Sequence, residues 1–399
     1  MYIAILGRQP SLGMAELERL YGADAVAWFS DNTTTIKTDT FSIDLLGGTQ
    51  KAGRIIFEVS GGDWRKVSLK LIQHYKKAWS TFEGKITLGI SAYGFEVAAR
   101  EVQKTGIILK QKLKETNISV RLIPNAEPIL NTATSHHNKL GLASNKFELL
   151  VVKGADGRIY IAESIGAQNI TSLARRDQGR PKRDAFVGML PPKLAQIMIN
   201  LATPPAAHPA LTTIKEGISP RLLDPFCGTG VILQEAALMG YRVYGTDLNE
   251  KMIRYSRDNL NWLQDTFHLH FDWYLHQGDA MSTTWQQPID IIVCESYLGQ
   301  PFSAPPSRQK LTEVKENCNH IIRRFLQNLA PQLTTDTRIC VAVPAWRDTS
   351  GRFTHLPLIN HLEELGYTLV PFQHVTRDQL MYYREDQVVA RELLVLVKA

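Results

Sequence analysis

The sequence is short of cysteine and has no long apolar run. Its 399 residues include four cysteines, all in the second half and none in a Cys-x-x-Cys pair, which argues against a disulfide framework or a zinc ribbon. No apolar run approaches the roughly 18 residues of a membrane-spanning helix, and the apolar start is too short for a secretory signal. With 44% apolar and 21% charged residues, disordered, collagenous and coiled-coil chains are also excluded. We therefore expect a cytoplasmic globular protein of two or three domains, without a membrane partner.

Positive charge is concentrated in the first half of the chain. The whole sequence has a net charge of +6, whereas residues 1–183 contain 26 Lys and Arg against 17 Asp and Glu, a net of +9. The remainder, with 19 against 22, carries −3. A basic region beside a mildly acidic one is typical of a polyanion-binding module joined to a second domain. A lysine-rich solvated surface would give the same count.

The two halves also differ in their predicted secondary structure. Residues 1–170 read as an α+β region of short strands and helices, including a hairpin around the Gly/Asp turn at 154–157. In residues 194–399, apolar strands alternate with helices, which predicts an α/β fold with a doubly wound, mostly parallel sheet. Such sheets bind ligands at the carboxyl ends of their strands.

A basic segment at residues 171–193 joins the two halves. Its cationic residues are interrupted by Gly179 and Pro181, so we expect an irregular linker without a regular helix. A cationic cluster of this kind is a candidate contact for phosphate groups, although a solvated loop would look the same. The candidates are Arg175, Arg176, Arg180, Lys182 and Arg183.

Three acidic motifs follow predicted strands of the second half. The segment 222–230 (LLDPFCGTG) is an apolar strand ending in an acid and a glycine turn, which allows close backbone approach to a ligand. The third glycine of a dinucleotide fingerprint is missing, because Leu233 stands in its place. Asp247, which ends the next strand, can accept both hydroxyls of a ribose. Asp279 follows in a Gly-Asp-Ala motif, near a possible adenine amine.

In this order, the three motifs resemble the S-adenosylmethionine site of class I methyltransferases. The residues of these motifs are similar to those of RNA methyltransferases with a THUMP domain, and most of all to those of the tRNA guanosine-10 N2-methyltransferase family. Segments 175–181 (RRDQGRP), 188–195 (GMLPPKLA) and 383–387 (YREDQ) support the resemblance, which spans nearly the whole chain.

The resemblance implies a Rossmann-like methyltransferase sheet preceded by a ferredoxin-like and THUMP RNA-binding module. It implies that S-adenosylmethionine lies over 224–230, that 188–193 covers it, and that the basic linker faces RNA. It also implies tRNA as the partner, and some relatives use a small activating subunit. The implied cofactor-binding residues are Asp224, Phe226, Gly228, Gly230, Asp247, Leu248, Asp279 and Ala280.

The fourth strand departs from the family pattern of an Asp or Asn, two prolines and an aromatic. The strand here runs into Cys294, Glu295, Ser296 and Tyr297. Either Cys294 occupies the place of the acid, or a one-residue shift makes Glu295 the acceptor for the target amine. We favour Glu295 as acceptor and Tyr297 as the residue that stacks on the base. We expect Cys294 to be a packed strand residue rather than a nucleophile, because amino methylation needs no covalent intermediate. No metal site is assigned, since His268 and His270 have no further ligand cluster nearby.

These observations predict an enzyme that methylates the N2 amine of guanosine in tRNA. One alternative is an amino-group methyltransferase acting on another RNA or on a DNA base. Another is an RNA-binding member that no longer catalyses, which the altered 294–297 segment would explain.

Overall fold

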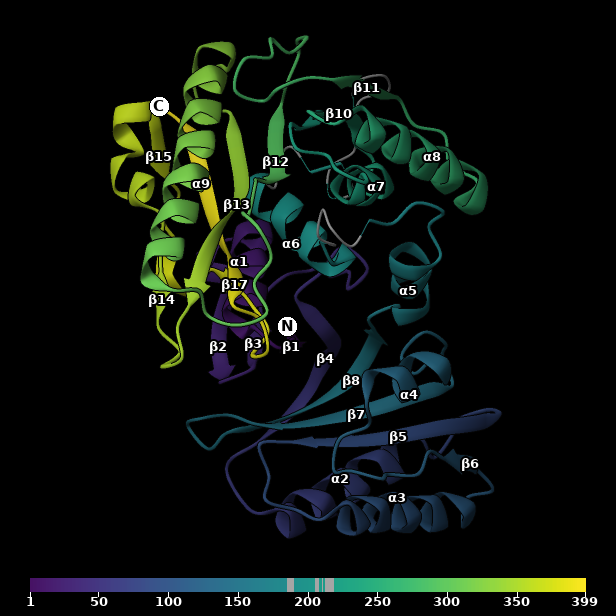
Figure 1. Cartoon of the computed structure of the whole chain (residues 1–399). Helices are drawn as coiled ribbons and strands as arrows, with labels where there is room; N and C mark the ends of the chain where they lie inside the picture. Colours follow the sequence, from purple (N-terminus) through teal and green to yellow (C-terminus); the bar gives the residue numbers. More distant parts are fainter. Residues whose placement is uncertain (185–189, 205–207, 210, 212–218) are drawn as a thin grey trace. The chain divides into compact units, whose positions relative to one another are not determined.

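The chain is described by a computed structural model that covers residues 1–184, 190–204, 208–209, 211 and 219–399 (Figure 1). It divides into two compact units. Unit 1 comprises Met1–Pro10, Asp24–Asp44 and Thr49–Ser172, and unit 2 comprises Ser11–Ala23, Leu45–Gly48 and Leu173–Ala399. Two short N-terminal segments therefore belong with the C-terminal unit, whereas the sequence analysis keeps all of residues 1–170 together.

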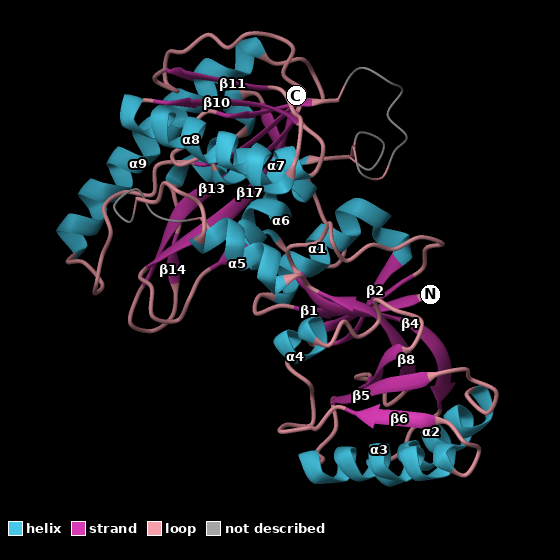
Figure 2. Ribbon diagram, turned by 90° about the vertical axis from the view of Figure 1, so that its right-hand side faces the viewer, coloured by secondary structure: helices cyan, strands magenta, loops and turns pink. Residues whose placement is uncertain are grey.

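Unit 1 is built on an eight-stranded sheet with the order β2-β3-β1-β4-β8-β7-β5-β6. The predicted hairpin is confirmed, because β7 and β8 pair antiparallel. Helices α2 (Trp64–Ala78) and α3 (Ala99–Lys114) pack on one face of the sheet, and α4 (Thr132–His137) lies on the other (Figures 1 and 2). The strands are β1 (Tyr2–Leu6), β2 (Val26–Ser30), β3 (Thr33–Ile36), β4 (Thr49–Val59), β5 (Lys85–Tyr93), β6 (Ser119–Leu122), β7 (Lys146–Lys153) and β8 (Ile159–Ala167).

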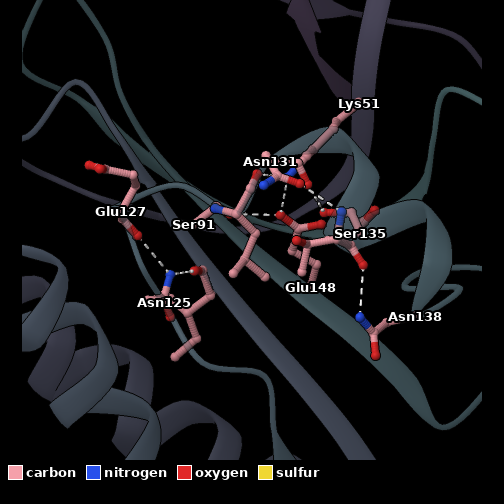
Figure 3. Close-up of polar contacts among 12 residues, drawn as sticks. Lys51, Ser91, Asn125, Glu127, Asn131, Ser135, Asn138 and Glu148 are labelled. Atoms are coloured by element: carbon pink, nitrogen blue, oxygen red, sulfur yellow. Dashed lines mark hydrogen bonds and ion pairs between the residues drawn. The ribbon is translucent and has the colours of Figure 1, made fainter. Parts of the chain in front are cut away.

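A buried ion pair fixes the segment that leads into α4 (Figure 3). Lys51 of β4 contacts the carboxylate of Glu148 on β7, and it donates a 2.6 Å hydrogen bond to the carbonyl of Leu130. Ser91 of β5 donates to Glu148 at 2.6 Å and accepts from the Leu130 N–H at 3.0 Å. Both backbone groups of Leu130 are thus bound to side chains, the carbonyl to Lys51 of β4 and the N–H to Ser91 of β5. Because these charges are almost fully buried, each depends on its partner.

Unit 2 contains the predicted doubly wound sheet. Its main path has the order β11-β10-β9-β12-β13-β17-β15. The first five strands of this order pair in parallel, and β17 is antiparallel to both of its neighbours. The strands are β9 (Arg221–Asp224), β10 (Arg242–Asp247), β11 (Trp273–Gln277), β12 (Ile291–Glu295), β13 (Arg338–Arg347), β14 (Phe353–Thr354), β15 (Tyr367–Leu369), β16 (Met381–Tyr382) and β17 (Val389–Lys398). This sheet confirms the predicted Rossmann-like class.

Helices cover this sheet and form its core with it (Figure 2). On α9, Phe325 and Leu326 pack in one apolar cluster with strand residues such as Ile292. The helices are α1 (Pro10–Tyr21), α5 (Ile170–Gln178), α6 (Pro192–Ala202), α7 (Val231–Leu238), α8 (Glu250–Phe267) and α9 (Arg308–Leu329). Within the described ranges, no helix combines the length and the apolar character that crossing a bilayer requires.

Glu16 of α1 ties the N-terminal segments of unit 2 together. Its carboxylate accepts 2.9 Å hydrogen bonds from the N–H groups of Gly47 and Gly48, and one of 2.7 Å from the Asn200 amide. The fit is close, because a Cβ on Gly47 would lie 2.0 Å from the Lys193 carbonyl oxygen. Burial nevertheless outweighs these hydrogen bonds and raises the pKa of Glu16 to about 7.

We expect the stability of unit 2 to fall as the pH rises from about 4.5 to 7. A folded-state pKa above the ordinary value of 4.5 means that the folded state binds the Glu16 proton more tightly than the unfolded state. Deprotonation across this window therefore disfavours folding, by up to about 3 kcal/mol once it is complete. The measurement is the difference in unfolding free energy between the native protein and Glu16→Gln, at pH 5 and pH 8. A difference that does not change with pH would contradict the prediction.

Candidate active site

A cavity of about 490 Å³ opens at the carboxyl ends of the central strands of unit 2. It lies at the switch point of the sheet, where the order runs to β10 on one side of β9 and to β12 on the other. Its volume is in the range of cofactor sites. Nine of the ten residues predicted for catalysis or cofactor binding line it, namely Asp224, Phe226, Gly228, Asp247, Leu248, Asp279, Ala280, Glu295 and Tyr297. Gly230 is instead the N-cap residue of α7.

The loop after β9 depends on glycine at two positions. Gly228 and Gly230 have φ values of +51° and +79°, in the left-handed region that side chains disfavour. At Gly230 a Cβ would also meet the Ser256 hydroxyl at 2.9 Å. The loop is held from α8, where the Ser256 hydroxyl donates to the Gly228 carbonyl at 2.8 Å and the Asn259 amide donates to the Thr229 carbonyl at 2.8 Å. The backbone facing the cavity is therefore rigidly placed.

Asp247 and Asp279 are both oriented by backbone N–H groups. The Asp247 carboxylate accepts from Gly228 at 3.0 Å and from Asn249 at 2.8 Å. Asp279 accepts from the N–H of Met281 at 2.9 Å. Burial raises the pKa of Asp247, more than these two hydrogen bonds lower it. Each carboxylate oxygen has a second lone pair, so both acids can still accept from a ligand in the cavity.

Asp224 adds a deeply buried carboxyl to the same cavity. It is 1% exposed and accepts from the Phe226 N–H at 3.1 Å. Burial raises its pKa well above the ordinary value, and the nearby acids Asp247 and Glu295 raise it further. Carboxyl groups gathered at this density favour a ligand that carries positive charge.

These features fit S-adenosylmethionine. Its ribose hydroxyls match the acceptor Asp247, and its adenine matches a region where the exposed Leu248 and the buried Ala280 lie near the acceptor Asp279. Its cationic sulfonium and ammonium groups match the cluster of carboxyl groups. The rigid glycine loop leaves room for close approach of the ligand, because no side chain is present at Gly228.

The segment after β12 forms another part of the wall. Glu295 and Tyr297 line the cavity, and Tyr297 is 41% exposed. Ser296 between them is buried, and Glu295 is ion-paired with Arg391 of β17. Cys294 is fully buried in the core and does not contribute to the lining, and burial raises its pKa well above the ordinary range. A packed thiol of this kind is inert.

The basic linker differs from the prediction. Residues 170–178 form a regular helix, α5, and Gly179 and Pro181 follow its end. Leu173 and Arg176 are three positions apart, so both fall on the buried face of this helix. Arg180 is 3% exposed, and its guanidinium has no hydrogen-bond partner among the described residues.

The prediction that Arg176 and Arg180 face RNA is therefore wrong, because neither is accessible. Lys182 is half-buried and lies 3.6 Å from the Asp258 carboxylate. Arg175 and Arg183 are exposed and stay candidates for RNA contact. Of the segment 188–193, Gly188 and Met189 lie outside the described residues, and Leu190 lines the cavity.

Arg176 is expected to act on stability rather than on RNA binding. It donates to the two carboxylate oxygens of Glu235 at 2.6 and 3.0 Å, and both side chains are buried. Replacing Arg176 by methionine leaves Glu235 without its charge partner and should reduce the unfolding free energy by about 3–5 kcal/mol. Arg175→Met, at an exposed position of the same helix, is the matched control. Denaturant titration of both variants measures the effect, and equal midpoints would contradict the prediction.

Sequence reasoning missed one charged residue of the site, Arg391. It lies 96 positions from its partner Glu295, so no local pattern connects the two. The available signal was the Arg391-Glu392 pair directly before the apolar run 393–397 of β17, because charges on a buried strand require partners.

Two family models match the chain. An RMKL-like methyltransferase domain matches residues 180–355, and a DNA methylase model matches residues 24–258, more than half of the chain.

Curated relatives and a solved structure are also similar. The chain is 33% identical to the tRNA (guanine(10)-N2)-dimethyltransferase of Methanothermobacter thermautotrophicus over 45% of this chain and 46% of that protein. It is 28% identical to the protein of the same name from Pyrococcus abyssi, over 39% of each chain. The match thus spans less than half the length of these relatives. The crystal structure of TrmN from Thermus thermophilus, at 18% identity and a TM-score of 0.51, covers 100% of this chain and 99% of that one, which is a likeness of fold.

Proposed function

The chain belongs to the S-adenosylmethionine-dependent methyltransferases that these family models describe, and on that premise we propose that it methylates the exocyclic N2 amine of guanosine in tRNA. The observation that carries the choice of base is the carboxylate of Glu295 at the end of β12, in the wall of the cofactor-sized cavity. The similarity to a guanine-N2 dimethyltransferase over 45% of this chain supports the same target.

A carboxylate at this place favours guanine over the other bases that carry amines. Guanine presents two neighbouring donors, N1–H and the N2 amine, which match the two oxygens of a carboxylate. Adenine and cytosine present an amine beside an unprotonated ring nitrogen. This ring nitrogen is an acceptor, so it could not form a hydrogen bond with the carboxylate oxygen that faces it. The unmatched pair costs binding energy in a desolvated pocket. Glu295 therefore supports N2 of guanine as the target atom.

The residues of the cavity have separate roles in this proposal. S-adenosylmethionine supplies an electrophilic methyl group on a sulfonium. Glu295 holds the amine by its N–H groups and directs the nitrogen lone pair, which otherwise delocalises into the ring. The nitrogen would form its new bond to the methyl carbon as the bond from that carbon to the sulfonium sulfur breaks and a neutral thioether leaves. The nitrogen would then lose a proton, for which the Glu295 carboxylate is an acceptor. Tyr297 offers a ring for stacking against a base that has left its helix. Alignment of the two reactants supplies much of the rate.

Unit 1 carries a surface suited to RNA. On α2 and α3 there are ten Lys and Arg residues against a single acid, Glu101, and nine of the ten cations are exposed. Clustered cations on one pair of helices bind a phosphate backbone without regard to sequence. We propose this helix pair, in a THUMP-type module, as an RNA contact in place of the buried linker arginines. The proposed partner is tRNA, and the proposed location is the cytoplasm.

A second candidate function is amino methylation of DNA, which the DNA methylase model favours. The two functions differ in polymer and in target atom, so a single experiment separates them. Purified protein is incubated with methyl-labelled S-adenosylmethionine and either unmodified tRNA transcripts or duplex DNA, and the labelled nucleoside is identified after digestion.

We expect labelled N2-methylguanosine from tRNA and no label in DNA. Label on adenine N6 or cytosine N4 of the DNA would overturn the proposal in favour of the second function. Binding of both S-adenosylmethionine and tRNA without transfer would instead favour a non-catalytic member or a required activating subunit.

The combined substitutions Lys66→Glu, Lys70→Glu and Lys77→Glu on α2 should weaken tRNA binding and reduce its dependence on salt.

A further inference from the structure

The ion pair between Glu295 and Arg391 links β12 to β17 across the intervening strand β13 in the sheet of unit 2. Glu295 is the last residue of β12 and lies opposite Ala342 of β13. Arg391 lies on β17, opposite Pro344 of β13, so its side chain spans β13 to reach the carboxylate. The contact joins the Arg391 Nε to the Glu295 Oε1, and the two side chains are 10% and 15% exposed. The pair therefore lies at the inner wall of the cavity, largely shielded from water.

Hydrogen bonds from the neighbouring residue, Ser296, hold the backbone beside Glu295. Ser296 donates two hydrogen bonds to one acceptor, the Ala342 carbonyl, from its N–H at 3.0 Å and from its hydroxyl at 2.9 Å. It is 3% exposed, so water does not compete for these bonds. A proline at this position would have no N–H to donate. Hydrogen bonds to β13 thus hold the chain direction between the acceptor and the aromatic residue.

We propose that Arg391 is a positioning residue for methyl transfer, which orients the Glu295 carboxylate toward the target amine with the backbone held by Ser296. This inference rests on the proposed function of Glu295. A glutamate side chain has one more rotatable bond than an aspartate, and an unpaired one would sample several rotamers in the cavity. With one lone pair of Oε1 bound to Arg391, the carboxylate keeps a defined orientation, and each of its two oxygens still has a lone pair for the ligand.

The charge of Arg391 serves the same arrangement. Asp224, Asp247 and Glu295 all line one cavity, and Asp247 and Glu295 add to the burial that raises the pKa of Asp224. The guanidinium of Arg391 places a positive charge beside these acids, in contact with Glu295. Arg391→Lys preserves the positive charge and N–H donors but not the planar guanidinium, and Arg391→Met preserves the bulk alone.

The experiment measures tRNA methylation by full-length Arg391→Lys and Arg391→Met. We expect Arg391→Met to lower kcat about 100-fold through misplacement of the acceptor, with KM for S-adenosylmethionine unchanged, and we expect Arg391→Lys to recover most of the rate. Arg347→Met is the matched control. Arg347 is the last residue of β13, and it donates to the Glu385 carbonyl rather than to a cavity carboxylate. Its rate should equal that of the native protein.

A double variant separates positioning from general support of the fold. In a Glu295→Gln background, which leaves no unpaired carboxylate, Arg391→Met should change kcat little. An equal loss in both backgrounds, a parallel rise in KM for the cofactor, or a lysine variant no better than methionine would overturn the inference. An active native protein whose Arg391 variants are unaffected would overturn this inference alone, whereas a native protein that leaves tRNA unmethylated would overturn the proposed function and this inference with it.

Discussion

Glu295→Gln is expected to lower kcat for tRNA methylation about 100-fold, with KM for S-adenosylmethionine within twofold of the native value. Glutamine keeps the size of the side chain but replaces one acceptor oxygen by a donor, which then faces the donor N–H groups of the target amine. Substrate and transition state both lose an acceptor, and the loss is larger in the transition state, where the nitrogen becomes cationic. The effect therefore falls mainly on kcat.

A measurement of cofactor affinity and a neighbouring control variant test this prediction further. Cofactor affinity measured by calorimetry should be unchanged, because Glu295 belongs to the wall formed after β12 rather than to the glycine loop. Cys294→Ala is the neighbouring control: it removes a buried thiol and should affect stability but not the chemical step, since Cys294 does not line the cavity. A full rate for Glu295→Gln would remove Glu295 from the reaction.

The second large effect is expected at Asp247. Alanine at this position should raise the dissociation constant for S-adenosylmethionine about 100-fold, equivalent to about 2.7 kcal/mol. The substitution removes the acceptor for the ribose hydroxyls. It also leaves the N–H groups of Gly228 and Asn249 without the carboxylate that they contact at 3.0 and 2.8 Å.

The Asp247 prediction has an internal control in the choice of ligand. S-adenosylhomocysteine has the same ribose but no sulfonium charge, so its affinity should fall by a similar factor. Asp258→Ala, on the exposed side of α8, should leave both affinities unchanged. A loss confined to S-adenosylmethionine would indicate that Asp247 acts on the positive charge rather than on the ribose.

Several elements of unit 2 could be read from local pattern because their signals are local. An apolar run ending in an acid and a glycine turn predicted β9, an apolar run ending in an acid predicted β10, and the alternation of strands with helices predicted α8. The carboxyl ends of parallel strands meet at one edge of a sheet, so residues predicted at strand ends were also expected to gather there. The cavity lining confirms that Asp224, Asp247 and Glu295 do gather.

Predictions from local sequence were wrong where contacts between residues distant in the sequence determined the structure. The alternation of strands and helices predicts a helix over residues 356–365, whereas the structure has two short 3-10 segments there, Pro357–His361 and Glu363–Leu365. The basic stretch looked solvated, yet Arg176 is buried because Glu235 lies beside it. A charge count cannot distinguish a paired cation from a free one.

The sequence by itself determined the class of sheet, the order of the cofactor motifs and the basic character of the first half, because each is encoded in residues close together along the chain. Only the tertiary structure decided which charges are available. It buried Arg176 against Glu235, and it brought Arg391 across β13 to Glu295. The physical reason is that burial makes an ionic group dependent on its partner, and partners 59 or 96 positions apart are chosen by the packing of strands and helices.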